Sequence, residues 1–381
     1  MHYLRFLCLL LLLPLPSQLQ QPAPAYQEVY RLANRYYDTA EPSARTDSLA
    51  SYYFEQTIRM VKSQPQLASV CIDCHIKLGN LHQGQQRYLR SLPFYYEAIR
   101  LAEQQKDTAL LYQASLYLGS ARYSMYEVDS ARYYFEAASR YAAGRSGLPD
   151  QPILYNSLGM IYFEAANYRQ AINYFQRALD QLDPQDESYA ESLVSFQNNI
   201  AGCYARLGQY DAARQEYEQL LPYGLLGESL FQNLGHVHFN LGQYDRALSY
   251  FGRVKPTVSG TYARLLNDKA RIRMYQGHLQ EAEQLLDSAI ALHRQLPGQG
   301  KNRDKAGSYL YRSRLAGQQG LLQEAIGWSN TALAELHYSF RPASLVDLPA
   351  TVPDVVWPVT FFEVLRDKAR LLEIRYYSTG E

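Results

Sequence analysis

The sequence predicts an all-α fold: an α-solenoid of about eight antiparallel helix pairs, followed by half of a ninth pair. Two patterns carry this prediction. The first is a triplet that recurs along most of the 381-residue chain: a small residue, then an aromatic or apolar residue, then another small or apolar residue. A pair of one aliphatic and one small residue precedes several of these triplets at a nearly constant distance. The repeat also explains the 35 tyrosines, because many of them recur at equivalent positions.

The triplet places its small residue first, an aromatic or apolar residue four positions later, and another small or apolar residue three beyond that. This spacing puts all three side chains on one face of a helix. Successive copies begin 41, 40, 40, 42, 34, 35 and 43 residues apart. Such a narrow range indicates a structural repeat. The first members are Ala50, Ser91, Ala131, Ala171, Ala213, Ala247, Ala282 and Ala325.

A second helix is expected upstream of each triplet, and it carries the aliphatic–small pair. We call it the first helix of a repeat, and the helix with the triplet the second helix. Glycines close several first helices, and tyrosines open the second helices that follow. The clearest pairs are Leu158-Gly159, Ile200-Ala201 and Leu234-Gly235; the closing glycines are Gly208, Gly242, Gly277 and Gly320.

These residues resemble the tetratricopeptide repeat (TPR) family at 158–178, 200–220 and 234–254, and the resemblance extends over roughly 26–338. It implies a right-handed superhelix whose first helices line a concave surface. The physical logic agrees, because small residues allow two helices to approach closely. A lone helix pair cannot bury its apolar face, so neighbouring pairs must stack. The longer copies need polar connections, and Gly298-Gln299-Gly300-Lys301 lies in one of these and lacks the pattern of a phosphate-binding loop.

The N-terminal residues 1–25 have the pattern of a secretory signal. His2 and Arg5 form a short polar start, and an apolar run follows from Phe6 to Leu15. That run is about half of the ~20 residues that a spanning helix needs. Ala23-Pro24-Ala25 offers a cleavage site. We therefore expect an exported protein, periplasmic or secreted, with no integral membrane segment in the mature chain.

Cys71-Ile72-Asp73-Cys74-His75 has the spacing of a covalent haem site. In the repeat register, however, His75 falls in a slot that aromatic residues occupy elsewhere, and Cys74 falls in a small or apolar slot. Cys71 is expected just before the helix. The favoured interpretation is packing, with cysteines as small apolar residues and no cofactor. An oxidisable thiol pair at a helix start and a haem site are the alternatives.

Composition excludes little else. The net charge is zero, which gives no electrostatic argument for nucleic acid or an anionic membrane. Three cysteines in the mature chain cannot form a disulfide framework. Cys203 is expected in an inter-helix seam, and His236 and His238 point to different faces of one helix, so they cannot share a metal. No catalytic constellation is apparent, and we expect a scaffold rather than an enzyme.

The TPR resemblance also implies a binding surface. Asn199 and Asn233 directly precede aliphatic–small pairs and match asparagines that hold a bound peptide's backbone in peptide-binding members. Asn156 and Asn267 lie one position earlier. Such amides beside arginines and aromatics suit an extended, partly acidic protein or peptide segment; the alternative is that they are merely exposed polar positions. The other predicted groove residues are Phe163, Arg206, His236, Asn240, Arg271 and Arg314.

The C-terminal part departs from the repeat. Residues 339–361 form a proline-rich linker that cannot be helical throughout. Residues 362–381 resemble a first helix, with Lys368-Ala369 aligned on Lys269-Ala270. The repeat style is loosely similar to exported bacterial CHAT-type (caspase-like) proteins. This implies an alternative function, as the sensing region of a larger protease or signalling receptor whose effector is encoded elsewhere.

Overall fold

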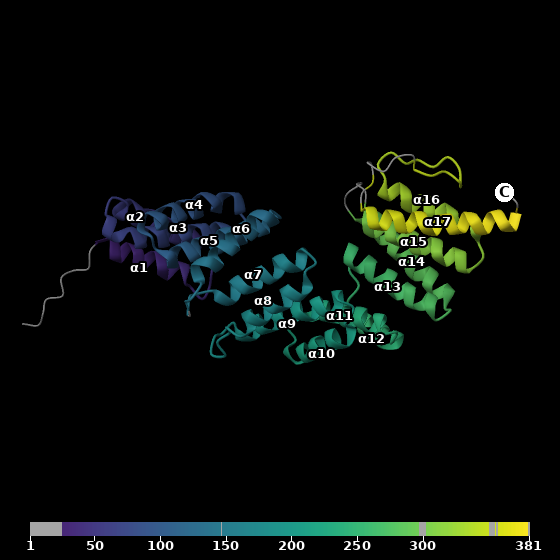
Figure 1. Ribbon diagram of the computed structural model, residues 1–381, viewed down its shortest axis with the longest axis horizontal. Helices are drawn as coiled ribbons and strands as arrows, with labels where there is room; N and C mark the ends of the chain where they lie inside the picture. The colour runs from purple at the N-terminus through teal and green to yellow at the C-terminus, as the bar shows by residue number, and fades with distance from the viewer. Residues whose placement is uncertain (1–24, 146, 297–301, 350–354, 356, 380–381) are drawn as a thin grey trace, which may run out of the picture. The chain divides into compact units, whose positions relative to one another are not determined.

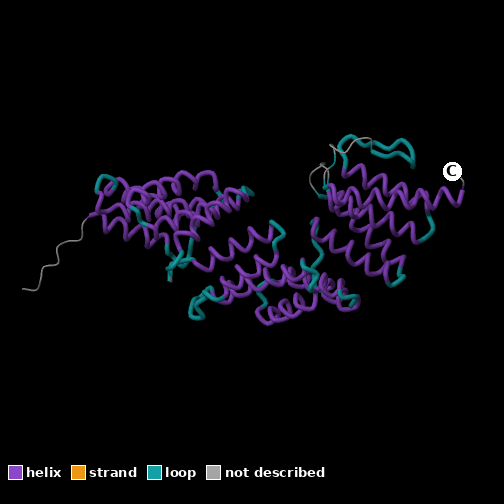
Figure 2. The backbone as a smooth tube through the Cα atoms, in the orientation of Figure 1, coloured by secondary structure: helices purple, strands orange, loops and turns teal. Residues whose placement is uncertain are grey.

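The computed structural model describes residues 25–145, 147–296, 302–349, 355 and 357–379. These residues form seventeen α-helices, joined by loops and two 3₁₀ turns (Figures 1 and 2). The prediction of an all-α chain built of consecutive antiparallel helix pairs is confirmed. Residues 1–24 of the predicted signal, the loop residues 298–301 and part of the proline-rich linker lie outside the described residues.

The chain divides into two compact units, Met1–Gln181 and Leu182–Glu381. The first unit contains four helix pairs, each made of a first helix and a second helix that pack on one another. A 3₁₀ turn, Pro65–Leu67, leads into the second pair. The helices are α1 (Ala25–Tyr37), α2 (Ala44–Val61), α3 (Ala68–Gly84), α4 (Tyr88–Gln105), α5 (Thr108–Ser124), α6 (Val128–Ala142), α7 (Gln151–Glu164) and α8 (Tyr168–Leu179).

The second unit contains four further pairs and one additional helix. Figure 1 shows this last helix, in yellow, along the final pair. A 3₁₀ turn, Leu221–Tyr223, follows α10. The helices are α9 (Tyr189–Arg206), α10 (Tyr210–Leu220), α11 (Gly227–Asn240), α12 (Tyr244–Gly252), α13 (Gly260–Tyr275), α14 (Leu279–Gln295), α15 (Arg303–Gln318), α16 (Leu322–Leu336) and α17 (Pro358–Thr379).

The predicted register is visible in the packing. All eight triplet-leading residues, from Ala50 to Ala325, have no exposed surface. The small residue of the first helix lies directly against the aromatic ring of the second. A Cβ added to Gly159 would lie 2.5 Å from a ring carbon of Phe175, and one added to Gly235 only 2.2 Å from Phe251. Glycine is therefore required for the close approach.

The turn after each first helix from α3 to α15 uses a left-handed backbone residue. Gly208 and Gly242 have φ of 75° and 70°, the conformation that glycine adopts without strain. Three earlier repeats place other residue types at the equivalent turn position. Gln86, Tyr126 and Ala166 have φ of 57°, 62° and 56°. These three turns store a small amount of backbone strain.

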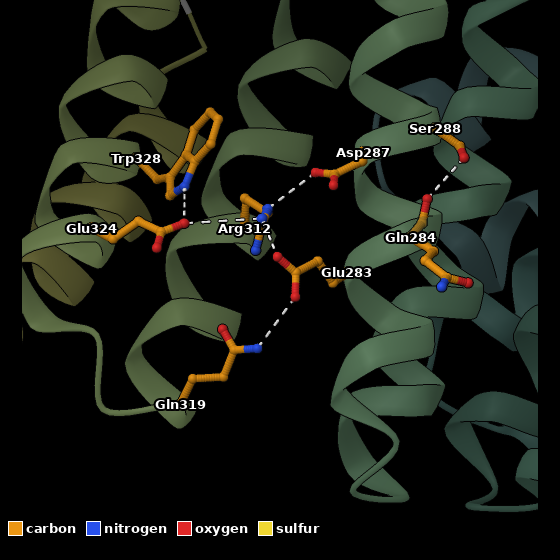
Figure 3. Close-up of polar contacts among 8 residues, drawn as sticks. All are labelled: Glu283, Gln284, Asp287, Ser288, Arg312, Gln319, Glu324 and Trp328. Atoms are coloured by element: carbon orange, nitrogen blue, oxygen red, sulfur yellow. Dashed lines mark hydrogen bonds and ion pairs between the residues drawn. The ribbon is translucent and has the colours of Figure 1, made fainter.

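The last pair departs from the common core pattern. Arg312 occupies the position of the aliphatic residue of the pair, and its side chain is only 8% exposed. The guanidinium group lies 2.5 Å from a carboxylate oxygen of Glu283 and 3.2 Å from one of Asp287, both on α14 (Figure 3). On the other side Glu324 of α16 lies 3.9 Å away. One buried arginine thus joins α14, α15 and α16.

The helix predicted at 362–381 exists, but it begins earlier, at Pro358. Proline suits this first position because its missing N–H would be unpaired there anyway. α17 packs against α16 and α15, as a further first helix would. Lys368 occupies the aliphatic position and is fully buried. Its ammonium group donates to the side-chain oxygen of Asn330 and to the backbone oxygen of Asp347.

Candidate functional site

The first helices of the second unit present two rows of equivalent side chains. We number positions from the aliphatic residue of the pair, which is position 0. Position −1 is one residue before it, and position +2 is two residues after it. Positions −1 and +2 are therefore three residues apart, about one turn along the same face. Position −1 holds Asn199, Asn233, Asp268, Tyr311 and Asp367; from α11 onward position +2 holds His236, Arg271, Arg314 and Arg370.

Contacts run from position +2 of one first helix to position −1 of the next. His236 Nδ1 lies 3.6 Å from Asp268 Oδ2. The Arg271 guanidinium carbon lies 5.2 Å from the ring centre of Tyr311, within reach of a cation–π interaction. Arg314 Nε donates to Asp367 Oδ2 at 2.6 Å. The sequence-predicted residues His236, Arg271 and Arg314 therefore lie along one surface that crosses α11, α13, α15 and α17.

The two asparagines of the predicted groove lie at position −1 on α9 and α11. Both are half-buried. The Asn233 amide nitrogen donates to the side-chain oxygen of Asn198 at 3.3 Å, so this contact joins α9 and α11. Each amide is thus held on a helix face rather than on a loop, and the two occupy the same register position.

Arg271 contacts three neighbouring side chains, Asp268, Phe239 and Tyr311. Its Nη1 lies 3.1 Å from Asp268 Oδ1, and the guanidinium carbon lies 4.6 Å from the ring centre of Phe239. The side chain is still 30% exposed. Because a guanidinium group has five donors in a planar fork, this geometry leaves donors directed to solvent. Arg271 is a fixed cation at a partly open surface.

Arg314 differs, because its charge is compensated within the chain. Nη2 lies 2.7 Å from Glu363 Oε1, in addition to the contact with Asp367. Burial acts to lower the pKa of Arg314, but the hydrogen bonds to these two carboxylates outweigh it and the pKa is raised. The neighbouring Tyr311 has a raised pKa because it is buried. The acidic partner expected for Arg314 is therefore supplied by α17 itself.

A cavity of about 580 Å³ lies beside these residues, with walls from α13, α15 and α17. Arg271 and Arg314 line it, as do the aromatic rings of Tyr275 and Tyr311. Its volume is in the range of small-molecule and side-chain pockets. The repeat motif predicted the helix at 362–381 but not this cavity, because the motif says nothing of how that helix docks.

Other predicted residues do not join this surface. Asn267 is 3% exposed, and its amide nitrogen donates to Ser308 Oγ at 2.8 Å. Asn267 stands at position −2 of α13, and this position faces α15, so the side chain is part of the packing between the two helices. Asn240 is exposed and donates to the backbone oxygen of His236 on its own helix. Arg206 is exposed near the end of α9.

Asn156 and Phe163 lie on α7, in the first unit. Both are half-buried. The Phe163 ring packs edge-on against Tyr168 of the adjacent second helix, with ring centres 5.4 Å apart. These two residues therefore belong to the first unit and not to the surface on α11–α17.

A polar network on α1 and α3 was not predicted from the sequence. Lys77, at position −1 of α3, donates to Asn34 Oδ1 at 2.5 Å and lies 3.1 Å from Asp73 Oδ2. Tyr30 donates to the same Asp73 carboxylate at 2.6 Å. Burial is the main cause of the raised pKa of Tyr30, followed by its hydrogen bond to Asp73. The register alone could have found Lys77, since it shares the position of Asn199 and Asn233.

The haem-like motif lies within a helix. α3 begins at Ala68, so Cys71 lies inside the helix, and the prediction that it lies just before the helix is wrong. The 3₁₀ turn that precedes α3 continues directly into it. Both cysteines are buried free thiols, and burial raises their pKa values. The half-buried His75 ring lies 6.2 Å from the ring of Phe94. These contacts support the packing interpretation over a reactive thiol pair.

Two of the remaining chemical candidates, Cys203 and His238, are also part of the core. Cys203 is buried, which raises the pKa of its thiol to about 12. His238 is buried against the ring of Tyr250, whereas His236 is exposed, so the two histidines do face different environments. Within the part of the chain that the structure describes, no three His, Cys, Asp or Glu side chains are placed to hold a metal ion. No described helix is both long and apolar enough to cross a membrane.

Comparison with known proteins agrees with the register. Three tetratricopeptide-repeat family models match, at residues 150–223, 228–254 and 267–338. The chain contains tetratricopeptide repeats. The repeats recognised by these models include the helices that carry Asn199, Asn233, Arg271 and Arg314.

Two curated proteins are similar to parts of this chain. One is the anaphase-promoting complex subunit CDC16 of Saccharomyces cerevisiae, 23% identical over 155 residues, which are 40% of this chain and 18% of that protein. The other is response regulator aspartate phosphatase E of Bacillus subtilis, 24% identical over 202 residues, 50% of this chain and 52% of the phosphatase. The chain therefore spans about half of the phosphatase and less than a fifth of CDC16.

Two solved structures resemble most of the chain. The apo form of RapI has a TM-score of 0.62 at 15% identity and covers 93% of this chain and 99% of its own. The apo form of the quorum sensor NprR from B. thuringiensis has a TM-score of 0.59 at 14% identity and covers 92% and 98%. At these identities the likeness shows the TPR fold alone.

Proposed function

We propose that this TPR protein binds an extended protein or peptide segment along the first helices of its second unit, as a scaffold rather than as an enzyme. The observation that carries the proposal is the continuous row of position −1 and position +2 contacts across α11, α13, α15 and α17. A segment laid across these helices would meet an equivalent side chain at each one.

The amides supply affinity that does not depend on the ligand's side chains. A side-chain amide donates and accepts at once, so it matches the N–H and C=O of an extended backbone. Asn199 and Asn233 are half-buried on rigid helices, which limits the entropy lost on binding. Arg271 adds charge. Its outward donors favour a ligand with acidic residues, so we propose a partly acidic segment.

Binding to a defined partner tests this function. A partner is captured from an extract of the source cells with the immobilised protein, identified and then titrated. Asn199→Ala and Asn233→Ala are each expected to weaken binding by ~1–2 kcal/mol, the usual cost of one backbone-directed hydrogen bond. Asn173→Ala removes an exposed amide on α8 and is the matched control. Undiminished affinity in Asn199→Ala, Asn233→Ala and Arg271→Ala, with the fold intact, would place the binding surface elsewhere.

We also propose that the protein is exported. It rests on the signal-like pattern of residues 1–25, and α1 begins at Ala25, so cleavage near Ala25 would leave the helical part nearly whole. Cell fractionation and N-terminal sequencing of the protein from its natural host decide this point. A full-length protein confined to the cytoplasm would refute it.

A second candidate is a regulatory or sensing role in signalling. The likeness to response regulator aspartate phosphatase E over half of the chain favours it. The expected link to CHAT-type proteases stays an expectation from repeat style. Incubation with a phosphorylated response regulator from the same organism tests catalysis directly: loss of the phosphoryl group above the spontaneous rate would replace the non-enzymatic proposal. The DNA downstream of Glu381 tests for an attached effector.

A further inference from the structure

The cavity at α17 has an unbalanced charge. The four arginines in its lining are Arg271, Arg314, Arg366 and Arg370, whereas the one carboxylate in its lining is Asp367. That carboxylate already contacts two of the arginines, Arg314 at 2.6 Å and Arg366 at 3.6 Å. Glu363 and Asp268, which lie outside the lining, pair with Arg314 and Arg271. The cavity is therefore electropositive.

The repeat register identifies Arg370 as the source of this imbalance. It is the position +2 residue of α17. From α11 onward, the position +2 side chain of one first helix meets the position −1 residue of the next: His236 meets Asp268, Arg271 meets Tyr311, and Arg314 meets Asp367. Arg370 forms no ion pair with any of the described residues, so its guanidinium is the one in the lining without a carboxylate partner.

Part of the cavity wall is apolar. Met274 of α13 and Leu371 and Ile374 of α17 line it. Ile374 is 52% exposed, and a branched aliphatic side chain gains free energy when it is covered. A ligand that fits this wall needs an aliphatic or aromatic group within a few ångströms of an anionic one.

We propose that this cavity binds a carboxylate carried on an aliphatic or aromatic group. The carboxylate pairs with Arg370, and the apolar group covers Leu371 and Ile374. The proposal deepens the groove-binding function and rests on it, because the cavity is the α17 end of the same surface. Two sources share this chemistry: the C-terminal residue of a bound peptide, and a free organic acid.

Calorimetric titration of the full-length protein tests this site. The probes are 4-phenylbutyrate, its primary amide, and acetate; the amide removes the charge and acetate removes the apolar group. We expect saturable binding of 4-phenylbutyrate and at least tenfold weaker binding of the other two. A tetrapeptide, acetyl-Ala-Ala-Ala-Phe, is compared as free acid and as amide. Tighter binding of the peptide acid than of 4-phenylbutyrate identifies a peptide terminus as the source, and the reverse identifies a small organic acid.

Two variants separate the contributions. Arg370→Gln should weaken 4-phenylbutyrate binding at least tenfold, and Ile374→Ser several-fold. Arg375→Gln removes an arginine on the same helix that does not line the cavity and should change nothing. Equal binding of acid and amide, no effect of Arg370→Gln, or no binding of any probe would overturn the proposal. So would dimerisation through α17 that closes the cavity.

The two proposals fail separately. If Asn199→Ala and Asn233→Ala leave partner binding unchanged while Arg370→Gln abolishes binding of the probe acid, then the groove proposal is wrong. In that case the cavity is an independent small-acid site. If partner binding depends on the asparagines and no acid probe binds, the groove stands and the cavity proposal is wrong.

Discussion

Substitution of Gly235 by alanine tests the repeat register most directly. The new Cβ would lie 2.2 Å from Cε1 and 2.4 Å from Cδ1 of Phe251. Ordinary contact begins at 3.4 Å, so the ring must retreat by at least about 1.2 Å. Phe251 is fully buried, in a cluster with Ala247 and Ile272. There is no open space for it to enter.

Two opposing terms set the magnitude. Alanine in a helix interior is favoured over glycine by about 1 kcal/mol. Overpacking of a buried site costs about 1–3 kcal/mol, and the required displacement places Gly235→Ala at the upper end of that range. We therefore expect a net loss of about 1–2 kcal/mol. Gly307→Ala is the matched control, because no atom lies within 4 Å of the added Cβ; it should gain about 0.5–1 kcal/mol.

The assay is urea denaturation of matched variants, followed by amide hydrogen exchange to locate the loss on α11 and α12. Repeat arrays can unfold in parts, so exchange rates are compared helix by helix. Phe251→Leu provides the second arm of a double-mutant cycle. It should absorb much of the cost of Gly235→Ala, because the smaller side chain leaves room. Equal stabilisation by Gly235→Ala and Gly307→Ala, or full additivity in the cycle, would refute the assigned contact.

Five other predictions follow from the packing. Arg312→Leu should cost less stability in urea than Arg312→Ala, because leucine fills the same position in other repeats, whereas alanine also leaves a cavity; the reverse order would contradict the register. Burial lowers the pKa of Lys368 to about 8. In the unfolded state this lysine has the ordinary pKa of about 10.4, so between about pH 8 and 10.4 the unfolded chain binds the proton that the folded chain has lost. The wild type should therefore gain stability relative to Lys368→Met as the pH rises through this range, which urea midpoints at pH 7 and 9.5 will measure. Ala166→Gly should stabilise by about 0.5–1 kcal/mol, because it relieves a left-handed backbone, whereas Ala171→Leu should destabilise by about 1–3 kcal/mol in the same assay. Finally, protein co-expressed with haem-ligation machinery should be colourless, since His75 packs on Phe94; a Soret band would overturn that interpretation.

The fold could be predicted because its determinants are local in sequence. A small residue and a ring separated by a fixed distance, as in Gly159 and Phe175, specify how two adjacent helices cross. Residues with a positive φ, such as Gly208, specify the turn between them. These features repeat, and repetition distinguishes them from chance. The same periodicity located the side chains of position −1 and position +2 on the surface.

The site could be predicted only in part, because charge partners are not local. Nothing near Arg314 in the sequence indicates that its partners lie on α17, about fifty residues later. Asn267 shares its residue type with Asn233 but stands one position earlier, and one residue turns a helix by about 100°. That rotation buries it against Ser308. The start of α3 was missed because Pro65 opens a 3₁₀ turn that continues into the helix instead of ending it.

The buried charges of the last repeats have a consequence for how the array assembles. Similar helix pairs offer many nearly equivalent surfaces, so a pair could dock one repeat out of place with little loss of apolar contact. An aliphatic residue at position 0 does not distinguish the right neighbour from a wrong one. Arg312 does, because only α14 presents Glu283 and Asp287 together opposite it, and an uncompensated buried charge costs about 3–5 kcal/mol. Lys368 acts in the same way toward Asn330. These two side chains make the C-terminal repeats non-interchangeable, so that a chimera which exchanges α15 for another first helix would lose its correct neighbour.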